Sequence, residues 1–562
     1  MSRTAATRYL TALAEHGVDS IFVNAGTDFA PIVEAYAINK KESGPTLPTP
    51  VLCAHENLAG GMAHGAALMT GKPQAVMLHV NVGTANVSCA VANAARDRIP
   101  LLITAGRSPI LEGGAVGARD LPIHWSQEMF DQASLVREFV KWDYELRDPR
   151  QVDAVVDRAL SIATAHPQGP VYLSLPREVL AEADDSAPGE RLRTPVPSAV
   201  WPDPAAVDAL ADRIVAAEFP VIVATASGIE PGSVDLLAAC AAQFAIGVAD
   251  PWHRYLNIPS NHPNRLGPDI NSVLKKADVI VFLESDVPWI DAHGSPRPDC
   301  FIAQVGVDPL YSDYPIRSHR SDINIAATPS AFLSRLTAAL GERAGRIDGA
   351  RAERIHAAAA AHHEAIAAQR ARETDAESDA PINKNTISAV LGELLGEDDI
   401  VFNEYVSTPC LLNRTQPGTY YFLPASGGLG WGLPAALGAQ YAAPGRTVVA
   451  TLGDGAYMFA NPAACHHAAA KHKLPVLTIL ANNTNWWAVD LATQLVYPDG
   501  RADAEDRFSN LSPSPDFAAY CTASGGHGAT VHKRSELRAA LVEALRVVRE
   551  EGRQALVDVR CQ

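Results

Sequence analysis

The segment that most constrains this chain is residues 446–483, RTVVATLGDGAYMFANPAACHHAAAKHKLPVLTILANN. It predicts an apolar strand that ends at Gly453-Asp454-Gly455, then a helix, then a second apolar strand that ends at Asn482-Asn483. Two glycines let the backbone approach a phosphate closely, beside a helix N-terminus whose free N–H groups favour anions. Because a phosphate would repel Asp454, a hard divalent cation with oxygen ligands should lie between them.

This segment has two alternative interpretations. A turn with a helix-capping aspartate is common. A dinucleotide site would need a third glycine in GxGxxG, but Met458 stands there. The combination of GDG with NN after 26 intervening residues, across one strand–helix–strand unit, is much more specific than either half alone. We therefore expect a site for a phosphate and a metal ion at this point.

Three stretches of the chain alternate short apolar strands with helical patterns, which predicts an α/β fold with parallel sheets covered by helices. A segment rich in proline and charge, residues 183–204, separates the first stretch from the second as a linker. The predicted domains are residues 1–183, 195–342 and 386–562, with a helical linker over 343–385.

Composition excludes several classes of function. The net charge of −17 argues against binding to nucleic acid or to an anionic membrane. No apolar run reaches the ~18 residues that span a bilayer, and the first 20 residues lack the apolar core of a signal peptide. The eight cysteines are scattered without a CxxC pair, so we expect reduced thiols and a cytoplasmic protein rather than a disulfide framework or a zinc site.

The GDG…NN segment resembles the thiamine-diphosphate (ThDP) signature of the family that includes acetolactate synthase, pyruvate decarboxylase and benzoylformate decarboxylase. The resemblance implies that Gly453, Gly455 and Ala456 contact ThDP, and that Mg²⁺ is held by Asp454, Asn483 and the Asn485 carbonyl. It also implies pyrimidine-binding, middle and diphosphate-binding domains, in that order.

Two further segments extend the resemblance over nearly the whole chain. In SGGLGWGLPAALGA, residues 426–439, it implies that the Gly427 carbonyl meets the 4′-amino group of ThDP and that Leu429 holds the cofactor bent. A glycine-rich turn before a packed helix is the alternative. In PVLCAHENLAGG, residues 50–61, it implies that Glu56 hydrogen-bonds N1′ of the aminopyrimidine and so promotes loss of the C2 proton. Alternatively, Glu56 only complements the dipole of its helix.

The subfamily is less clear from the sequence. The pattern LH…GT.N around His79 resembles benzoylformate decarboxylase and predicts a histidine that handles protons, although a buried structural histidine fits too. Thr27 would face the substrate carboxylate or would cap a helix. His293 would be a second active-site histidine. WSQEMFDQ looks more like acetolactate synthase and places Gln127 near the cofactor, and Trp486 with Trp487 would line an aromatic pocket or serve packing.

The predicted activity is ThDP- and Mg²⁺-dependent cleavage or formation of a C–C bond next to a carbonyl, with a 2-oxo acid or 2-hydroxy ketone as substrate. A decarboxylase or lyase with carboligase ability is favoured over an acetolactate-synthase-like transferase. The chain ends at Gln562, right after its last predicted strand, which disfavours a C-terminal lid and with it a 2-hydroxyacyl-CoA lyase. No FAD signature is evident, and an inactive regulatory protein is the alternative outside enzymes. The resemblance implies a homodimer or homotetramer whose site takes Glu56 from one chain and Asp454 from another.

Overall fold

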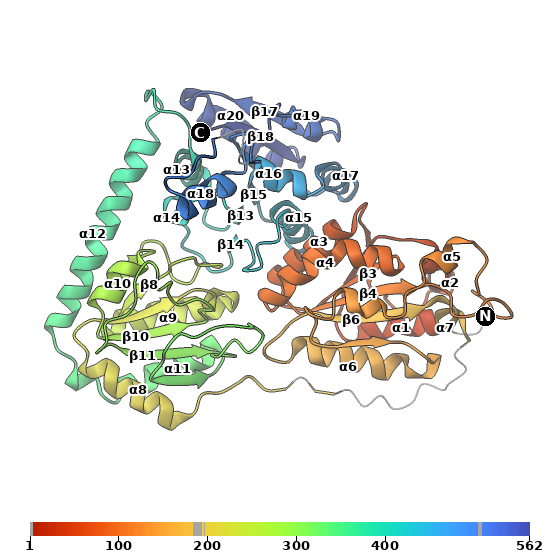
Figure 1. Ribbon diagram of the computed structural model, residues 1–562, viewed down its shortest axis with the longest axis horizontal. Coiled ribbons are helices and arrows are strands. Elements are labelled where there is room, and N and C mark those ends of the chain that lie inside the picture. The colour runs from red at the N-terminus through yellow and green to blue at the C-terminus, as the bar shows by residue number, and fades with distance from the viewer. Residues whose placement is uncertain (1–3, 184–193, 196, 504–507, 562) are drawn as a thin grey trace. The chain divides into compact units, whose positions relative to one another are not determined.

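The computed structural model describes residues 4–183, 194–195, 197–503 and 508–561 (Figure 1). Residues 184–193 and 196 of the predicted linker lie outside these ranges. The chain forms two compact units, one of residues 1–197, 423–530 and 543–560, the other of 198–422, 531–542 and 561–562. Three parallel six-stranded sheets flanked by helices confirm the predicted α/β class. Across the described ranges, no helix is both long enough and apolar enough to cross a bilayer.

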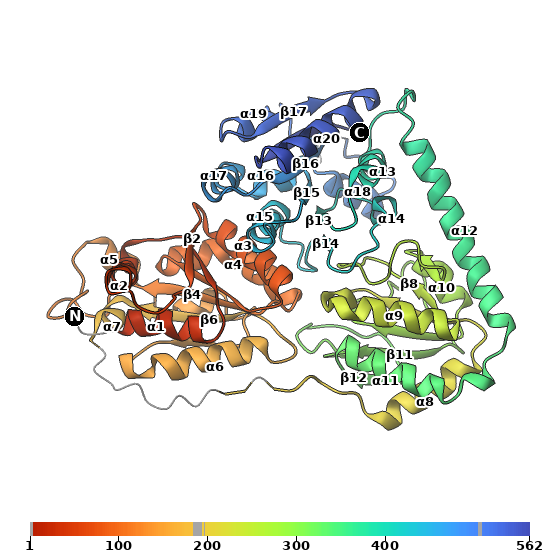
Figure 2. The ribbon, with the colours of Figure 1, turned by 180° about the vertical axis from the view of Figure 1, so that it is seen from behind.

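The first sheet has the strand order β2-β1-β3-β4-β6-β5. Its strands are β1 (Ser20–Val23), β2 (Thr49–Leu52), β3 (Gln74–Leu78), β4 (Leu101–Arg107), β5 (Asp143–Glu145) and β6 (Val171–Pro176). The helices of this stretch are α1 (Ala5–Glu15), α2 (Ala30–Lys41), α3 (Glu56–Thr70), α4 (Val80–Arg96), α5 (Ile123–Ser126), α6 (Val152–Thr164) and α7 (Arg177–Ala181), with 3-10 turns η1 (Thr27–Phe29), η2 (Gln132–Leu135) and η3 (Pro149–Gln151). Helices α1 and α6 pack together on one face, and α3 and α4 cover the other (Figure 2). Leu10 and Leu13 of α1 are both fully buried, as their helical spacing requires.

The second sheet, in the other unit, has the order β12-β11-β10-β7-β8-β9. Its strands are β7 (Pro220–Ala224), β8 (Gly247–Ala249), β9 (Arg265–Gly267), β10 (Val279–Leu283), β11 (Phe301–Gly306) and β12 (Ile323–Ala326). The accompanying helices are α8 (Pro204–Ala216), α9 (Pro231–Phe244), α10 (Ile270–Lys276) and α11 (Pro329–Gly341), with η4 (Ser227–Ile229) and η5 (Ala344–Arg346). The helical segment predicted over 343–385 contains the 24-residue helix α12 (Ala350–Glu373).

The third sheet has the order β14-β13-β15-β16-β18-β17. Its strands are β13 (Ile400–Glu404), β14 (Tyr420–Phe422), β15 (Val448–Gly453), β16 (Val476–Asn482), β17 (His527–Val531) and β18 (Ala555–Arg560). The helices of this part are α13 (Lys384–Leu394), α14 (Pro409–Leu412), α15 (Gly432–Ala442), α16 (Asp454–Phe459), α17 (Pro462–His472), α18 (Trp487–Val496), α19 (Phe517–Thr522) and α20 (Arg534–Glu550). Strands β15 and β16 pair in parallel with Gly453 opposite Ala481, so both end at the same edge.

Within the first unit, glycines allow α3 and α15 to pack backbone to backbone. A Cβ added at Gly65 would come within 1.9 Å of the Ala435 carbonyl oxygen, and one at Gly438 within 1.9 Å of the Met62 carbonyl oxygen. Because no side chain larger than hydrogen fits at these positions, the close approach depends on glycine. Helix α3 begins at Glu56 and α15 follows the loop that contains Gly427, so this contact joins two segments predicted to bind the cofactor.

Candidate functional site

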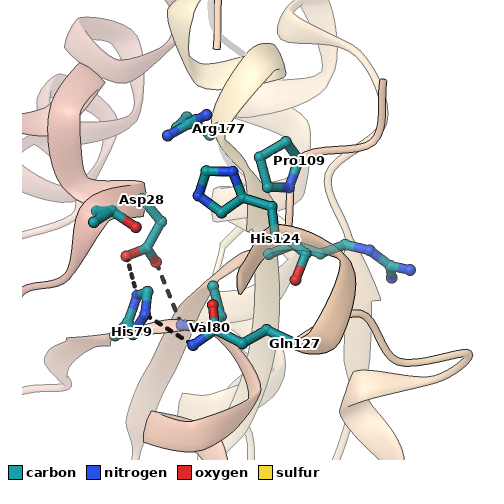
Figure 3. Close-up of a pocket in the computed structure, with 10 residues that line it drawn as sticks. Asp28, His79, Val80, Pro109, His124, Gln127 and Arg177 are labelled. Atoms are coloured by element: carbon teal, nitrogen blue, oxygen red, sulfur yellow. Dashed lines mark hydrogen bonds and ion pairs between the residues drawn. The ribbon is translucent and has the colours of Figure 1, made fainter. Parts of the chain in front are cut away.

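A small pocket lies at the carboxyl edge of the first sheet (Figure 3). Its walls come from the segments that follow four neighbouring strands: Thr27 after β1, His79 after β3, Pro109 after β4 and Arg177 after β6. Helix α5 and its end add His124 and Gln127. The carboxyl ends of parallel strands are where α/β proteins gather ligand-binding groups. The structure thus brings together three of the predicted residues, Thr27, His79 and Gln127.

His79 has a defined set of partners in this pocket. Its Nδ1 lies 2.6 Å from Oδ1 of the buried Asp28, and its Nε2 lies 3.4 Å from Nε2 of Gln127. The hydrogen bond to Asp28 raises the pKa of His79, burial lowers it, and the negative charges of Asp28 and Glu56 raise it further. A histidine in this setting can exchange a proton near neutral pH.

The remaining pocket side chains differ in charge and exposure. Thr27 is exposed at the start of η1, where Gly26 is the N-cap and no side chain caps the turn, so the helix-cap alternative is wrong. His124 is buried and its Nδ1 accepts from the N–H groups of Asp120 and Leu121 at 3.3 Å each. Burial lowers the pKa of His124, and the charge of Arg177 acts in the same direction. The Asp120 carboxylate, 3.2 Å from Nδ1, acts in the opposite direction.

Both arginines of the pocket are engaged by protein groups. Arg107 pairs with Glu128 and Glu145. Arg177 donates from Nε to the Gly117 carbonyl at 2.8 Å and also pairs with Asp120. These contacts fix the loop between β4 and η2.

Glu56 is the first residue of α3 and is nearly buried. Asn86 of α4 donates from Nδ2 to Glu56 Oε2 at 3.2 Å, and His55 Nδ1 lies 3.9 Å from the same oxygen. His55 caps α3 by accepting from the Asn57 N–H. The carboxylate is thus held by a neutral amide rather than by a salt bridge to a lysine or arginine of the described residues.

The glycine-rich loop before α15 is fastened by a buried side chain of α4. Asn93 Oδ1 accepts from the Gly428 N–H at 3.1 Å and from the Ser426 hydroxyl, and its Nδ2 donates to the Gly428 carbonyl at 2.8 Å. Gly427 adopts a φ of 67°, a left-handed conformation that glycine tolerates. Leu429, the predicted wedge, is half-buried in this loop.

At the carboxyl edge of the third sheet, Asp454 follows β15 directly and is buried. Burial raises the pKa of Asp454 to about 6, while the backbone N–H groups of Gly455 and Thr484 lower it. Within the described ranges, no arginine, lysine or histidine side chain forms an ion pair with Asp454. A buried carboxylate without a cationic partner is costly to ionise, and a divalent ion would relieve that cost.

Asn483 and Asn485 lie on the neighbouring segment, just after β16. Asn483 Oδ1 accepts from the Asn485 N–H at 3.1 Å. Asn485 Oδ1 is buried and has no hydrogen-bond partner among the described residues. Added side-chain atoms at Gly453 would meet nothing within 4 Å, so the backbone is open on that side. Oxygen donors around a buried carboxylate beside open glycine backbone fit both Mg²⁺ and a diphosphate.

The two tryptophans after this edge differ in their contacts. Trp486 lies against Gly455, where an added Cβ would come within 2.3 Å of the indole Nε1, and its ring is 6.4 Å from that of Phe459. Trp487 is 57% exposed at the start of α18. Whether the pair lines an aromatic pocket or serves packing stays a prediction.

His293 lies in the other unit, exposed in the turn after β10, where its N–H bonds to the Ile290 carbonyl. Its predicted place in the active site stays a prediction. The sequence analysis missed Asp28, His124, Asn86 and Asn93 as members of the site. Asp28 stands beside Thr27 in VNAGTDF and Asn86 closes the GT.N pattern, so both were within reach of the motifs.

The parallel sheets, with polar groups gathered at their carboxyl edges, define an α/β protein that binds a small molecule there. Residues 3–135 match the family model of the thiamine pyrophosphate enzyme N-terminal TPP binding domain, and residues 406–559 match that of the C-terminal TPP binding domain. The chain belongs to the family of ThDP-dependent enzymes.

Relatives with known names agree with this assignment. The chain is 28% identical to benzoylformate decarboxylase of Pseudomonas aeruginosa, over 98% of this chain and 97% of the relative. It is 25% identical to the acetolactate synthase isozyme 3 large subunit of Escherichia coli, over 91% and 87%. The crystal structure of benzoylformate decarboxylase from Polynucleobacter necessarius superposes with a TM-score of 0.81 at 21% identity, covering 100% of this chain and 99% of that one. At that identity the structural likeness speaks for the fold alone.

Proposed function

We propose that this enzyme decarboxylates a 2-oxo acid, or cleaves and joins the related 2-hydroxy ketones, with ThDP and Mg²⁺, in the manner of benzoylformate decarboxylase. The observation that carries the proposal is His79, which lies in the pocket of the first sheet with its pKa raised by Asp28. Such a group can give a proton to, or take one from, a reacting carbon or oxygen. The relative named benzoylformate decarboxylase supports the same substrate class.

The cofactor would be anchored at the third sheet. Asp454, Asn483 and the Asn485 carbonyl would hold Mg²⁺, and Gly453, Gly455 and Ala456 would contact the diphosphate. Support comes from the buried Asp454 with its raised pKa and from the parallel pairing of β15 with β16. When bound, ThDP supplies a carbon nucleophile that attacks a carbonyl and an electron sink for the broken C–C bond.

Other residues of the chain would activate the cofactor and orient the substrate. Glu56, steadied by Asn86, would hydrogen-bond the aminopyrimidine, and Gly427 with Leu429 would hold its position and bend. Thr27 and Gln127 would orient the substrate carboxylate, since both line the same pocket as His79. His293 would be a further active-site histidine.

A second candidate is an acetolactate-synthase-like carboligase, which transfers a two-carbon unit to another carbonyl compound. Gln127 favours it, because this residue of the synthase-like segment lies 3.4 Å from His79 Nε2, inside the pocket. The two candidates share the cofactor and differ in what accepts the intermediate fragment.

The test is incubation with ThDP, Mg²⁺ and a panel of aromatic and aliphatic 2-oxo acids and 2-hydroxy ketones, read by mass spectrometry. An aldehyde product with released CO₂ is expected for at least one 2-oxo acid. A 2-hydroxy-3-oxo acid formed from two molecules of 2-oxo acid with release of one CO₂, without free aldehyde, would favour the carboligase. Turnover of no member of the panel would reject the proposed substrate class.

The proposed assembly is a homodimer or homotetramer in which Glu56 of one chain meets Asp454 of another. The proposed domain bounds remain 1–183, 195–342 and 386–562 with the linker 343–385, and each range contains the strands of one sheet. Mixing inactive Glu56→Gln and Asp454→Ala proteins should restore partial activity through hybrid dimers. Because α3 also packs on α15 of its own chain, failure to restore activity would favour a site within one chain.

We also propose a cytoplasmic location, since Cys53, Cys240 and Cys465 are buried free thiols.

A further inference from the structure

Asp28 is a buried carboxylate that touches the proposed proton-transfer group directly. It lies in η1, next to the pocket-facing Thr27, and is 4% exposed. Its Oδ1 is 2.6 Å from His79 Nδ1, and its Oδ2 is 3.4 Å from the Val80 N–H (Figure 3). One carboxylate therefore contacts both the ring of His79 and the backbone that follows it.

Glycines on two neighbouring segments leave room for this pair. A Cβ at Gly26 would come within 2.1 Å of His79 Nδ1, and a Cβ at Gly106 within 1.7 Å of Asp28 Oδ2. Contacts that short are not possible, so any larger residue would displace the ring or the carboxylate. Backbone of the β1–η1 connection and of β4 thus closes around the two side chains.

The backbone directly after His79 is held in an unusual conformation. Val80 has a φ of 34°, which β-branched residues rarely adopt. Residues in such conformations persist where the surroundings hold them in place, and they gather at functional sites. The Asp28 carboxylate meets the N–H of this same residue, so one side chain secures both the strained turn and the imidazole.

From these contacts we infer that Asp28 is a positioning residue that binds Nδ1–H of His79 and thereby presents Nε2 as the atom that transfers the proton. The inference rests on the proposed function. A carboxylate on one ring nitrogen fixes the tautomer, because that nitrogen must carry the hydrogen. In neutral His79 the other nitrogen is then an acceptor, and Gln127 Nε2 stands 3.4 Å away to donate to it.

The charges around His79 set the direction of its titration. Asp28 of η1 and Glu56 of α3 favour the protonated ring and burial opposes it, while His124 of α5, whose own pKa is lowered by burial, lines the same pocket with Arg107 and Arg177. Removing the Asp28 charge should therefore lower the pKa of His79. Any limb of the pH–activity profile that reports His79 should move to lower pH.

The experiment is NMR of the cofactor-loaded enzyme labelled with ¹³C and ¹⁵N in histidine, with the His79 signal identified by its loss in His79→Ala. In wild type, neutral His79 should be the Nδ1–H tautomer. In Asp28→Asn its pKa should fall and the Nε2–H tautomer should gain population. In parallel, kcat should fall with little change in KM, by roughly the 10- to 100-fold that losing the carboxylate partner of a metal-bound histidine costs.

The matched control is Asp157→Asn, which removes an aspartate 3.1 Å from His16 Nε2, a pair that does not line the pocket. It should change neither the His79 signals nor the pH profile.

If Asp28→Asn does not fold, the tautomer of His79 in wild type decides alone: an Nε2–H tautomer rejects the inference. Shifted His79 signals without turnover of any 2-oxo acid would uphold the Asp28–His79 pair and reject the proposed function. Turnover of a 2-oxo acid, together with His79 signals that do not shift in Asp28→Asn, would uphold the proposed function and reject the Asp28–His79 pair.

Discussion

The carboxyl edges of the first and third sheets differ in how their charged side chains are stabilised. At the first, charged groups are paired inside the protein: His79 with Asp28, and Arg107 with Glu128 and Glu145. At the third, backbone N–H groups stabilise the charge of the buried Asp454, no side chain of the described residues forms an ion pair with it, and burial raises its pKa to about 6. The named charges of the first edge thus have partners of opposite sign, whereas Asp454 of the third edge has none among the described residues.

This difference indicates a division of labour between the two edges. A site that moves protons needs groups held in a fixed orientation with tuned pKa values. A site that anchors a charged cofactor needs oxygen donors whose burial is offset by the metal. Substitutions at the third edge should therefore act on cofactor binding, and substitutions at the first edge should act on turnover.

The largest expected effect is that of Asp454→Ala. Without this carboxylate the protein should lose Mg²⁺-dependent retention of ThDP, and activity should vanish with it. Isothermal titration calorimetry with ThDP and Mg²⁺ measures the loss. Asp499→Ala, at an exposed position, is the control and should bind as wild type does. Equal affinity in wild type and Asp454→Ala would refute the metal site.

His79→Ala should lower turnover by roughly 10²- to 10⁴-fold, the typical cost of losing one acid–base group. The loss should appear equally in kcat and kcat/KM, because the interaction belongs to the transition state. Binding of ThDP should stay nearly unchanged. A variant that melts at a lower temperature yet turns over at the wild-type rate would show that His79 is only structural.

The close contact between α3 and α15 should be sensitive to added side-chain volume. Gly65→Ala places a Cβ against the Ala435 carbonyl, which cannot move without shifting α15. We expect a loss of about 1–3 kcal/mol in the free energy of unfolding, the usual range for overpacking. Denaturant titration measures it. Gly232→Ala in α9, where an added Cβ meets nothing within 4 Å, should cost no stability.

At neutral pH the smallest effect is that of His64 on α3, because its contribution changes only below about pH 6.5. Burial lowers its pKa to about 3, and its ring meets Trp431 edge-on at 5.6 Å. Because the folded pKa lies below the unfolded value, His64 favours folding fully above about pH 6.5, and this contribution is lost as the pH falls toward 3. The stability of wild type should therefore fall more steeply on acidification than that of His64→Gln, by up to about 1.4 kcal/mol per pH unit. If the free energies of unfolding of the two proteins fall in parallel with pH, His64 does not change its protonation on unfolding.

Much of the fold was predictable because the long buried strands are continuous apolar runs. The apolar runs QAVMLHV, PLLITAG, RTVVATLG and LPVLTILAN predict strands, and β3, β4, β15 and β16 lie there. The strands without such a run are short, and each lies at or beside a sheet edge: β5, β8, β9, β12, β14 and β17.

The site was predictable only as far as local motifs reach. Thr27, His79 and Gln127 converge because each follows or faces the end of a strand in one sheet. Asp28 was missed because the direction of its side chain depends on the short turn η1, which no periodicity reveals. Asn93 holds Gly428 from 335 residues away, a contact that a single sequence does not encode locally.

The most direct test of this division of labour is hydrogen–deuterium exchange at C2 of bound ThDP in Glu56→Gln. Glu56 lies with the first-sheet groups, on α3, and should activate the cofactor without anchoring it. The account predicts wild-type ThDP stoichiometry and affinity by calorimetry, with C2 exchange slowed severely. Exchange as fast as in wild type would contradict it, and so would a Glu56→Gln protein that no longer retains ThDP.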